Sequence, residues 1–234
     1  MNALITDDPK PDEATLTRLC GYRLTNAVCA VSRAETRTLC VEGARRHVTL
    51  WDFGAKRNIV NELLLRGCDV TIMPAHASAA DIRAARPDGI LLSNGPGDPA
   101  ENTAVIEQLQ LLCEANIPIF GICLGHQLLA LARGGETMKL KYGHRGANQP
   151  VQELATKKVY ITSQNHGYAV KTGDALPKHA RMSFQNLNDG TCEGMEYLDI
   201  PAFSVQFHPE ACGGPLDTRF LFDRFIERMD CASQ

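Results

Sequence analysis

The sequence predicts an α/β fold of three layers, with helices on both faces of a mostly parallel central sheet. Between residues 47 and 133, short apolar runs alternate with segments of helical periodicity, a pattern typical of parallel strands joined by covering helices. Hydrophobic residues make up 44% of the 234 residues and charged residues 22%, so a full core is available. A Gly-Pro-Gly loop at residues 95–97 and a cysteine at position 123 each follow an apolar run. Both therefore lie at carboxyl ends of strands, where such sheets bind ligands.

Composition and charge exclude several classes of protein. The net charge of −3 argues against a surface for nucleic acid or anionic membranes. No apolar run approaches the roughly 18 residues of a membrane span, and the first residues lack an export signal. The nine cysteines are an odd number, without a C-x-x-C pair or a Cys/His grouping at zinc spacing. We therefore expect a cytoplasmic protein with reduced thiols and no metal site, and neither nucleic acid nor membrane as a partner.

Residues 1–46 differ from the rest of the chain. A polar, proline-broken entry at residues 7–12 precedes a short predicted helix over Ala14–Cys20, and residues 22–32 have mixed periodicity. This is too little for an independent core, because segments below about 40 residues seldom fold unaided. We expect residues 1–46 to be an appendage and residues 47–234 to be the main domain.

The first half of that domain predicts four strands, each followed by a loop or turn and a helix. The strands are expected at residues 48–51, 69–73, 89–93 and 118–123. The first helix has an apolar face from residue 59 to 64 and is ended by Gly67. The other helices are expected at residues 79–86, around an apolar stripe from 105 to 113, and at 127–132 before Gly134.

The second half is rich in predicted strands. They are expected at residues 149–154, 159–162, 168–170, 182–187, 192–197 and 202–207, before a last helix at 216–228. A polar run, residues 163–168, separates two of these strands and is interpreted as a loop. Such a loop is solvated by default; alternatively, its amide side chains and backbone grip a polar, zwitterionic substrate.

Cys123 is the candidate nucleophile. It stands at the centre of Gly-Ile-Cys-Leu-Gly, residues 121–125, between a predicted strand and a predicted helix. This is the thiol version of the strained G-x-S-x-G elbow that lifts a nucleophile above a sheet. The positive end of the following helix favours a thiolate, and the amide of Leu124 points where an oxyanion would form. The alternative interpretation is a buried structural cysteine before a helix.

A cysteine nucleophile needs a base and a group that orients the base. Among the seven histidines, His208 ends an apolar strand and is followed by Pro209 and Glu210. Proline keeps the segment extended, so the imidazole and the carboxylate face the same side, and the acid can fix the tautomer. The other histidines are placed in the helix after the elbow (His126), in polar loops (His144, His166) or at the surface (His47, His76, His179).

The loop at residues 95–97 has two interpretations. It is a plain turn, for which the Asn-Gly and Gly-Pro pairs suffice. Alternatively, its side-chain-free backbone supplies a second amide to an oxyanion hole.

Two of these stretches resemble the class I (triad) glutamine amidotransferases: residues 121–127, Gly-Ile-Cys-Leu-Gly-His-Gln, and residues 207–210, Phe-His-Pro-Glu. Within that family, residues 52–59, 93–99 and 163–167 are similar to the glutamine-hydrolysing small subunit of carbamoyl-phosphate synthase. The likeness runs from about residue 47 to 229 and implies a flavodoxin-like sheet. Glutaminase domains that serve GMP, CTP, anthranilate or aminodeoxychorismate synthesis share the Cys and His-Pro-Glu motifs but not the full set.

The resemblance implies a mechanism. Cys123 would attack the carboxamide of glutamine to form a thioester and release ammonia, with His208 as base and then acid and Glu210 orienting it. The amides of Gly95 and Leu124 would hold the oxyanion. The other positions that match glutamine-binding residues of the family are Gly97, Gln127, Asn165, Gly167 and Tyr168.

The resemblance also implies a partner. The ammonia would pass to a large synthetase subunit that uses ATP, Mg²⁺ and bicarbonate to make carbamoyl phosphate for arginine or pyrimidine synthesis, while this chain holds no cofactor. Family members carry a whole N-terminal domain that adds a serine to the glutamine site, and residues 4–9 and 27–32 resemble its closing part. We therefore expect a fragment, an internal start or a truncated relative. Two other hypotheses stay open, a non-catalytic interaction module and a stand-alone cysteine hydrolase of γ-glutamyl amides.

Overall fold

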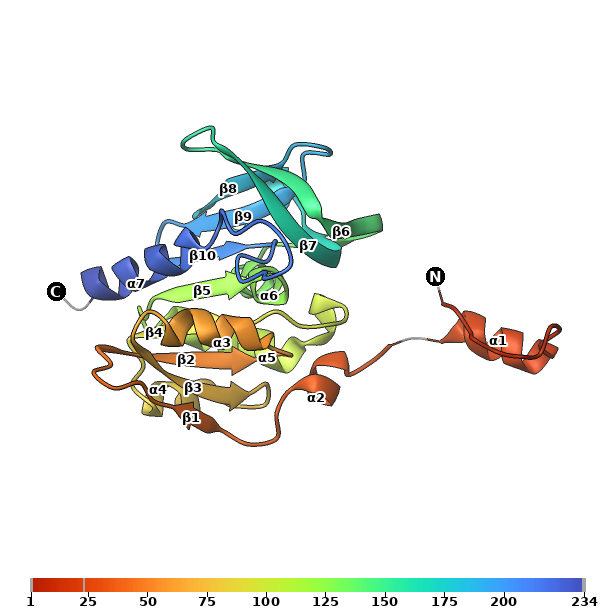
Figure 1. Ribbon diagram of the computed structural model, residues 1–234, viewed down its shortest axis with the longest axis horizontal. Coiled ribbons are helices and arrows are strands. Elements are labelled where there is room, and N and C mark those ends of the chain that lie inside the picture. Colours follow the sequence, from red (N-terminus) through yellow and green to blue (C-terminus); the bar gives the residue numbers. More distant parts are fainter. Residues whose placement is uncertain (1, 23, 233–234) are drawn as a thin grey trace.

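The protein, described by a computed structural model over residues 2–22 and 24–232, is built on one sheet of ten strands (Figure 1). The strand order across the sheet is β1-β3-β2-β4-β5-β10-β9-β8-β6-β7. Strand β10 comes last of the ten in the sequence. It lies between β5, from the first half of the main domain, and β9, from the second half.

The parallel strands form the part of the sheet that the sequence predicts most directly. These strands are β2 (Arg46–Asp52), β3 (Cys68–Pro74), β4 (Gly89–Leu92), β5 (Ile119–Ile122) and β10 (Ala202–Val205). Neighbouring members pair in parallel, in the order β3-β2-β4-β5-β10. All four residues of β4, β5 and β10 are buried, as expected for strands covered on both faces.

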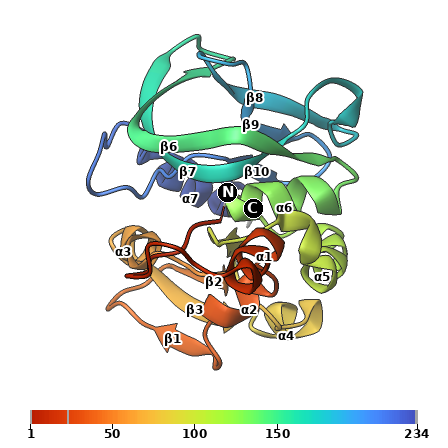
Figure 2. The ribbon, with the colours of Figure 1, turned by 90° about the vertical axis from the view of Figure 1, so that its right-hand side faces the viewer.

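Helices cover both faces of this sheet, which confirms the three-layer prediction. Figure 2 looks along the strands and has α3 (Arg57–Leu64) and α7 (Phe220–Ala232) on one side. On the other side lie α4 (Ala79–Ala84), α5 (Thr103–Cys113) and α6 (Leu124–Ala132). Each helix presents apolar residues to the sheet at helical spacing.

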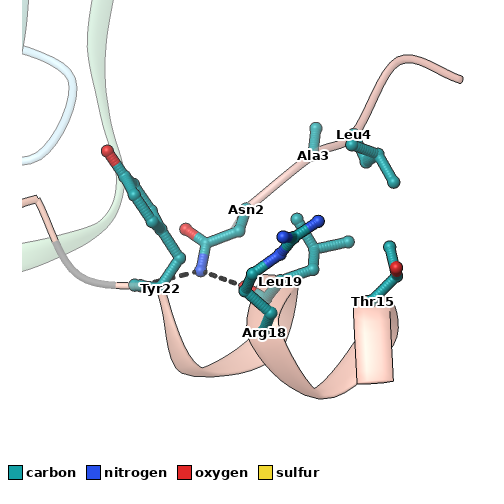
Figure 3. Close-up of a pocket in the computed structure, with 7 residues that line it drawn as sticks. All are labelled: Asn2, Ala3, Leu4, Thr15, Arg18, Leu19 and Tyr22. Carbon is teal, nitrogen blue, oxygen red and sulfur yellow. Dashed lines mark hydrogen bonds between the residues drawn. The ribbon is translucent and has the colours of Figure 1, made fainter. Parts of the chain in front are cut away.

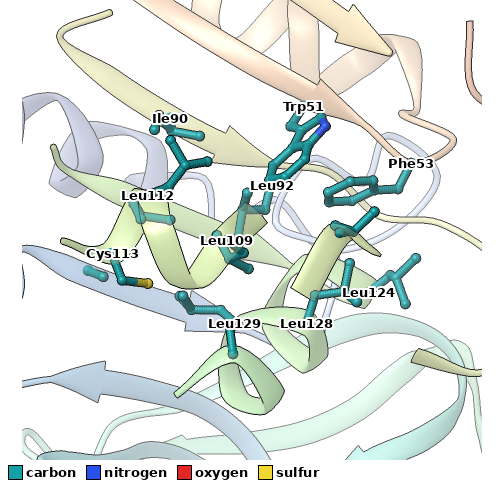
Figure 4. Packing of buried hydrophobic residues seen from close by; sticks show 14 of the residues in the cluster. Trp51, Phe53, Ile90, Leu92, Leu109, Leu112, Cys113, Leu124, Leu128 and Leu129 are labelled. Atoms are coloured by element: carbon teal, nitrogen blue, oxygen red, sulfur yellow. The ribbon is translucent and has the colours of Figure 1, made fainter. Parts of the chain in front are cut away.

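Two hydrophobic clusters fill the spaces between the layers. On the α7 side, Phe120 stacks on Phe203 with ring centroids 4.5 Å apart, and Phe222 meets Phe120 edge-on at 5.7 Å. On the α5–α6 side, the cluster includes Trp51, Leu92, Leu109 and Leu128 (Figure 4). These clusters hold the carboxyl ends of β4 and β5 in fixed positions.

Four antiparallel strands extend the sheet beyond β10. They are β9 (Cys192–Tyr197), β8 (Ala180–Asn186), β6 (Thr137–Glu153) and β7 (Val159–Val170). The predicted loop at residues 163–168 is wrong, because the two strands expected at its ends are one continuous strand, β7. The placement of His144 and His166 in loops is wrong for the same reason, since the two residues are paired across β6 and β7.

The physical reason for this error is a buried polar face. Thr162, Gln164 and His166 alternate along β7 and are buried, while Asn165 between the last two is exposed. The two-residue period of a strand is present, but polar side chains occupy the inward positions. A prediction based on polarity alone therefore assigns this segment to a loop.

The N-terminal segment contains α1 (Glu13–Gly21), α2 (Ala27–Val31) and β1 (Arg37–Leu39). Helix α1 agrees with the helix expected at Ala14–Cys20 and stands apart from the sheet in Figure 1. Strand β1 pairs antiparallel with β3, so the last part of residues 1–46 extends the sheet. The domain boundary at residue 47 stays a prediction. Two short 3₁₀ helices, Pro99–Glu101 and Gly173–Ala175, complete the elements.

A hollow of about 560 Å³ lies between α1 and the first residues of the chain (Figure 3). The side-chain amide of Asn2 donates to the carbonyls of Leu19 and Tyr22, at 2.8 and 2.9 Å. These two bonds fold the first residues back onto α1. Within the described residues, none of the helices combines the length and apolarity needed to cross a membrane.

Candidate active site

Cys123 occupies a strained turn between β5 and α6. Its φ of 53° and ψ of −100° lie outside the ordinary regions for a residue with a side chain, at a cost of about 1–3 kcal/mol. The turn is held from both sides: the Cys123 amide donates to the Val205 carbonyl at 2.8 Å, and its carbonyl accepts from the Gln127 amide at 3.2 Å. This is the elbow geometry that the sequence predicts, with α6 beginning directly at Leu124.

Glycines beside Cys123 permit close packing of the turn. A Cβ on Gly125 would lie 2.4 Å from the Leu92 carbonyl oxygen, and one on Gly121 would lie 2.9 Å from Gly125 backbone atoms. The Gly125 amide also donates to the Ser93 carbonyl at 3.0 Å. The elbow is therefore pressed against the end of β4, where residues 95–97 begin.

His208 and Glu210 follow β10, three and five residues after its last residue, Val205. Nδ1 of His208 is 2.7 Å from Oε1 of Glu210, and both side chains are buried. The His208 amide donates to the Ser163 carbonyl at 2.9 Å, which ties this segment to β7. The strand predicted to reach residue 207 leaves its parallel pairing after Val205, because β5 ends at the elbow.

The imidazole of His208 lies within hydrogen-bonding reach of the Cys123 side chain. Burial by itself lowers the pKa of His208, but the charge and hydrogen bond of Cys123 and those of Glu210 outweigh it and raise this pKa to about 9. With Nδ1 engaged by Glu210, Nε2 is left for the sulfur. The structure thus places the three candidate catalytic side chains in a row.

Glu210 has two further neighbours, Lys56 and Asn58. Lys56 Nζ is 3.3 Å from Glu210 Oε1, and the Asn58 side-chain amide donates to the Glu210 carbonyl. Burial raises the pKa of Glu210, but the hydrogen bond and charge of His208, followed by the charge of Lys56, hold it below its usual value. Sequence reasoning used residues 52–59 only as a family likeness and missed these contacts.

A narrow cavity of about 100 Å³ opens beside Cys123. Its lining includes six residues predicted for glutamine binding, namely Gly95, Gly97, Gln127, Asn165, Gly167 and Tyr168. Leu124 is the only predicted binding residue absent from this lining; it stands next to Cys123 in the chain. His166 and Pro96 also line the cavity and were not predicted.

The cavity adjoins a wider hollow of about 1000 Å³, which shares Gly97, Gly167 and Tyr168 and also has Lys139 and Arg145 in its wall. Asp98 and Glu101 lie in the same wall, so the approach to the cavity is polar and carries charges of both signs.

Two predicted residues shape the cavity through packing and hydrogen bonding. A Cβ on Gly95 would lie 2.4 Å from the Phe53 carbonyl oxygen and 2.6 Å from Leu124 Cδ2, so only glycine fits beside α6. Gln127 Nε2 donates to the Tyr168 carbonyl and to Gln206 Oε1, each at 2.8 Å. Gln127 therefore braces β7 against α6 in addition to lining the cavity.

The site and fold agree with one family of known proteins. The family model described as glutamine amidotransferase class-I matches residues 49–228. A GMP synthase component from Thermoplasma acidophilum has the same fold, with a TM-score of 0.69 and 22% identity over 80% of this chain and 94% of its own. The chain belongs to the class I glutamine amidotransferases.

Its sequence relatives are more specific. The chain is 51% identical over 210 residues to the carbamoyl phosphate synthase small chain of Symbiobacterium thermophilum, covering 89% of this chain and 57% of the relative. It is 55% identical over 186 residues to the corresponding small chain of Syntrophotalea carbinolica, covering 80% and 49%. The chain thus spans about half the length of the curated relatives it matches.

The packing of the elbow generates a stability prediction. Replacing Gly125 with alanine forces its backbone away from Leu92, and we expect a loss of about 1–3 kcal/mol in the free energy of unfolding. Gly213→Ala is the matched control, because a Cβ there meets nothing within 4 Å. Urea unfolding measures both, and equal stability of the two variants contradicts the packing argument.

His126 generates a prediction about pH. It is fully buried behind the elbow, with Nδ1 2.8 Å from Ser204 Oγ, and burial lowers its pKa to about 3. In the unfolded chain His126 takes up a proton as the pH falls through about 6.5, whereas in the native chain it stays neutral down to about pH 3. The stability that neutral His126 contributes above pH 6.5 is therefore lost on acidification towards pH 3.

From pH 7 to pH 5 this contribution amounts to about 2 kcal/mol. We therefore expect His126→Asn to flatten the pH dependence of the free energy of unfolding by about that amount, with His179→Asn, at an exposed position, as the control. Urea unfolding at the two pH values is the measurement. Parallel pH profiles for wild type and His126→Asn contradict the assignment.

Proposed function

We propose that this chain hydrolyses L-glutamine to glutamate and ammonia as the glutaminase component of a carbamoyl-phosphate synthase. The observation that carries the proposal is the row Cys123–His208–Glu210 at the edge of a cavity lined by the predicted glutamine residues. The identity to small chains of carbamoyl phosphate synthases supports the choice of pathway.

The proposed reaction has two halves. The Cys123 sulfur attacks the side-chain carboxamide carbon of glutamine, and His208 gives its proton to the leaving nitrogen as the C–N bond breaks. Ammonia departs and a glutamyl thioester remains. Water then attacks the thioester with His208 taking up its proton, and the C–S bond breaks to release glutamate and restore the thiolate.

Three features of the site support these roles. The raised pKa of His208 keeps a proton on the imidazole at neutral pH, ready for the leaving group. Glu210, buried with its charge facing His208 Nδ1, stabilises the imidazolium and orients the ring. Gly95 packs against Leu124, the residue after Cys123, and we assign the backbone amides of both to the oxyanion hole of the tetrahedral intermediate.

The chemistry at Cys123 needs only side chains, backbone amides and water. We assign ATP, Mg²⁺ and bicarbonate to a large synthetase subunit that takes up the ammonia and makes carbamoyl phosphate for arginine or pyrimidine synthesis. The matched relatives are small chains, which supports an assembly with a larger partner. All nine cysteines are free, which supports a reducing, cytoplasmic location.

The nucleophile is tested by Cys123→Ser. A serine hydroxyl does not ionise near neutral pH, so we expect glutamate release to fall by at least about 1,000-fold. Cys231→Ser, at an exposed position in α7, is the control and should keep wild-type activity. The assay is glutamate production, with and without a large subunit.

Other results of this assay support a different function for the chain. Wild-type chain that releases no glutamate in either assay indicates a non-catalytic interaction module. Rapid hydrolysis of γ-glutamyl amides that is independent of any large subunit indicates a stand-alone hydrolase. Near-normal turnover by Cys123→Ser removes Cys123 from its role.

The roles of the base and the orienting acid are separated by two variants. His208→Ala removes the proton carrier, whereas Glu210→Gln keeps the ring and loses only its orienting charge, so we expect the smaller loss of kcat for Glu210→Gln. Steady-state kinetics with glutamine give both values. A larger loss for Glu210→Gln means that the two roles are misassigned.

A further inference from the structure

A second cluster of ionisable side chains lies in the antiparallel half of the sheet and includes His166, which also lines the cavity beside Cys123. His144 on β6, His166 on β7 and Glu193 on β9 each direct one potential ligand atom to a common point, and these atoms lie within 4.8 Å of one another. His166 and Glu193 are 6% and 0% exposed. Three separate strands therefore contribute to one buried cluster.

The distances within the cluster fit tetrahedral coordination of a metal ion. His144 Nδ1 is 3.2 Å from His166 Nε2 and 3.2 Å from Glu193 Oε1, and His166 Nε2 is 4.0 Å from Glu193 Oε1. Tetrahedral ligands bound to Zn²⁺ at about 2.0–2.1 Å are about 3.4 Å apart. The three spacings bracket this value, so the side chains need only small shifts to ligate.

The outer nitrogens of both rings are already engaged. His166 Nδ1 lies 2.7 Å from the Tyr168 carbonyl, and His144 Nε2 lies 2.8 Å from Asp189 Oδ2. Metal-ligating histidines characteristically donate their other N–H to a carbonyl or carboxylate, which fixes the ring and the tautomer. Both histidines show this arrangement, and both inner nitrogens face the cluster.

The cluster also brings several lone pairs together. A carbonyl can only accept, so His166 Nδ1 carries the proton and the neutral ring directs the Nε2 lone pair inward. Oε1 of Glu193 faces the same point, and Gln164 Oε1 is 3.0 Å from His166 Nε2. Glu193 Oε1 also accepts long hydrogen bonds from Asn186 Nδ2 and Thr191 Oγ1, at 3.3 and 3.4 Å. His166 Nε2 and Gln164 Oε1 still face each other and share only the one proton on His144 Nδ1, whereas a divalent cation accepts lone pairs from all of these atoms.

We propose that His144, His166 and Glu193 form a binding site for a divalent transition metal ion, Zn²⁺ in the first place, with Gln164 Oε1 or water as the fourth ligand. Two imidazoles and a carboxylate are a ligand set that Zn²⁺ favours. The proposal differs from the expectation of a chain without a metal site, which rested on sequence spacing. The ion takes no part in the chemistry at Cys123.

The position of the site gives it a structural role. Its ion ties β7 to β6 and β9, and β7 supplies Asn165, Gly167 and Tyr168 to the cavity beside Cys123. The ion therefore holds one wall of the cavity in place. This role rests on the proposed function, whereas metal binding itself does not.

The binding experiment uses the full chain after treatment with a chelator and alkylation of its thiols with iodoacetamide, because the five exposed cysteines and Cys123 also bind Zn²⁺. Calorimetric titration with Zn²⁺ and elemental analysis measure affinity and stoichiometry. Co²⁺ then reports the ligands by its visible spectrum. We expect one ion per chain, and a four-coordinate Co²⁺ spectrum without sulfur-to-cobalt charge transfer.

Variants distinguish Zn²⁺ binding at this cluster from binding elsewhere on the chain. We expect Glu193→Gln and His144→Asn each to weaken Zn²⁺ binding by at least about 100-fold. If one of these variants fails to fold, the other suffices for the test. Asp189→Asn should weaken it by about 10-fold through the ring of His144. His179→Asn, at an exposed histidine, and Cys123→Ser should leave it unchanged.

Two results overturn the proposal. One is the absence of tight Zn²⁺ binding by the alkylated wild-type chain, which makes the cluster a hydrogen-bond network only. The other is binding that survives Glu193→Gln and His144→Asn. Because these measurements need no glutamine, a chain that binds Zn²⁺ but releases no glutamate contradicts the proposed function and leaves the metal site intact.

Discussion

The parallel pairing of β5 with β10 is the constraint on which the site depends. Val205 is paired with Ile122, so the residues that follow the two strands leave the sheet at the same edge. The Cys123 turn is anchored directly to β10 by its bond to the Val205 carbonyl. A histidine three residues beyond Val205 thereby meets a cysteine that lies 85 residues earlier in the chain.

The buried charges around His208 form one connected arrangement. A lone buried carboxylate is unfavourable, and Glu210 is stabilised in its charged form by His208 and Lys56, which both contact its Oε1. Asn58 holds the Glu210 backbone from the same loop-and-helix segment. The segment after β2 therefore contributes to the site through electrostatics and positioning, across more than 150 residues of sequence.

The antiparallel half of the sheet supports the site from the other side. Its inward face on β7 is polar, and the His208 amide, Gln127 and the cavity all contact this strand. Hydrogen bonds partly satisfy these polar residues: Gln164 donates to Glu193, and His166 Nδ1 donates to the Tyr168 carbonyl. The buried network gives β7 a defined position against α6.

The sequence by itself determined the elements whose signals are local. The elbow at Cys123, the apolar stripes of α3, α5 and α7, and the His208–Glu210 pair each lie within about a dozen residues, where glycine spacing and hydrophobic period specify the conformation. Only the tertiary structure decided that β10 lies beside β5, that Lys56 meets Glu210, and that residues 163–168 continue a strand. Those features depend on which distant segments hydrogen-bond to one another and on polar groups that become satisfied only when buried, and neither is written in a local pattern.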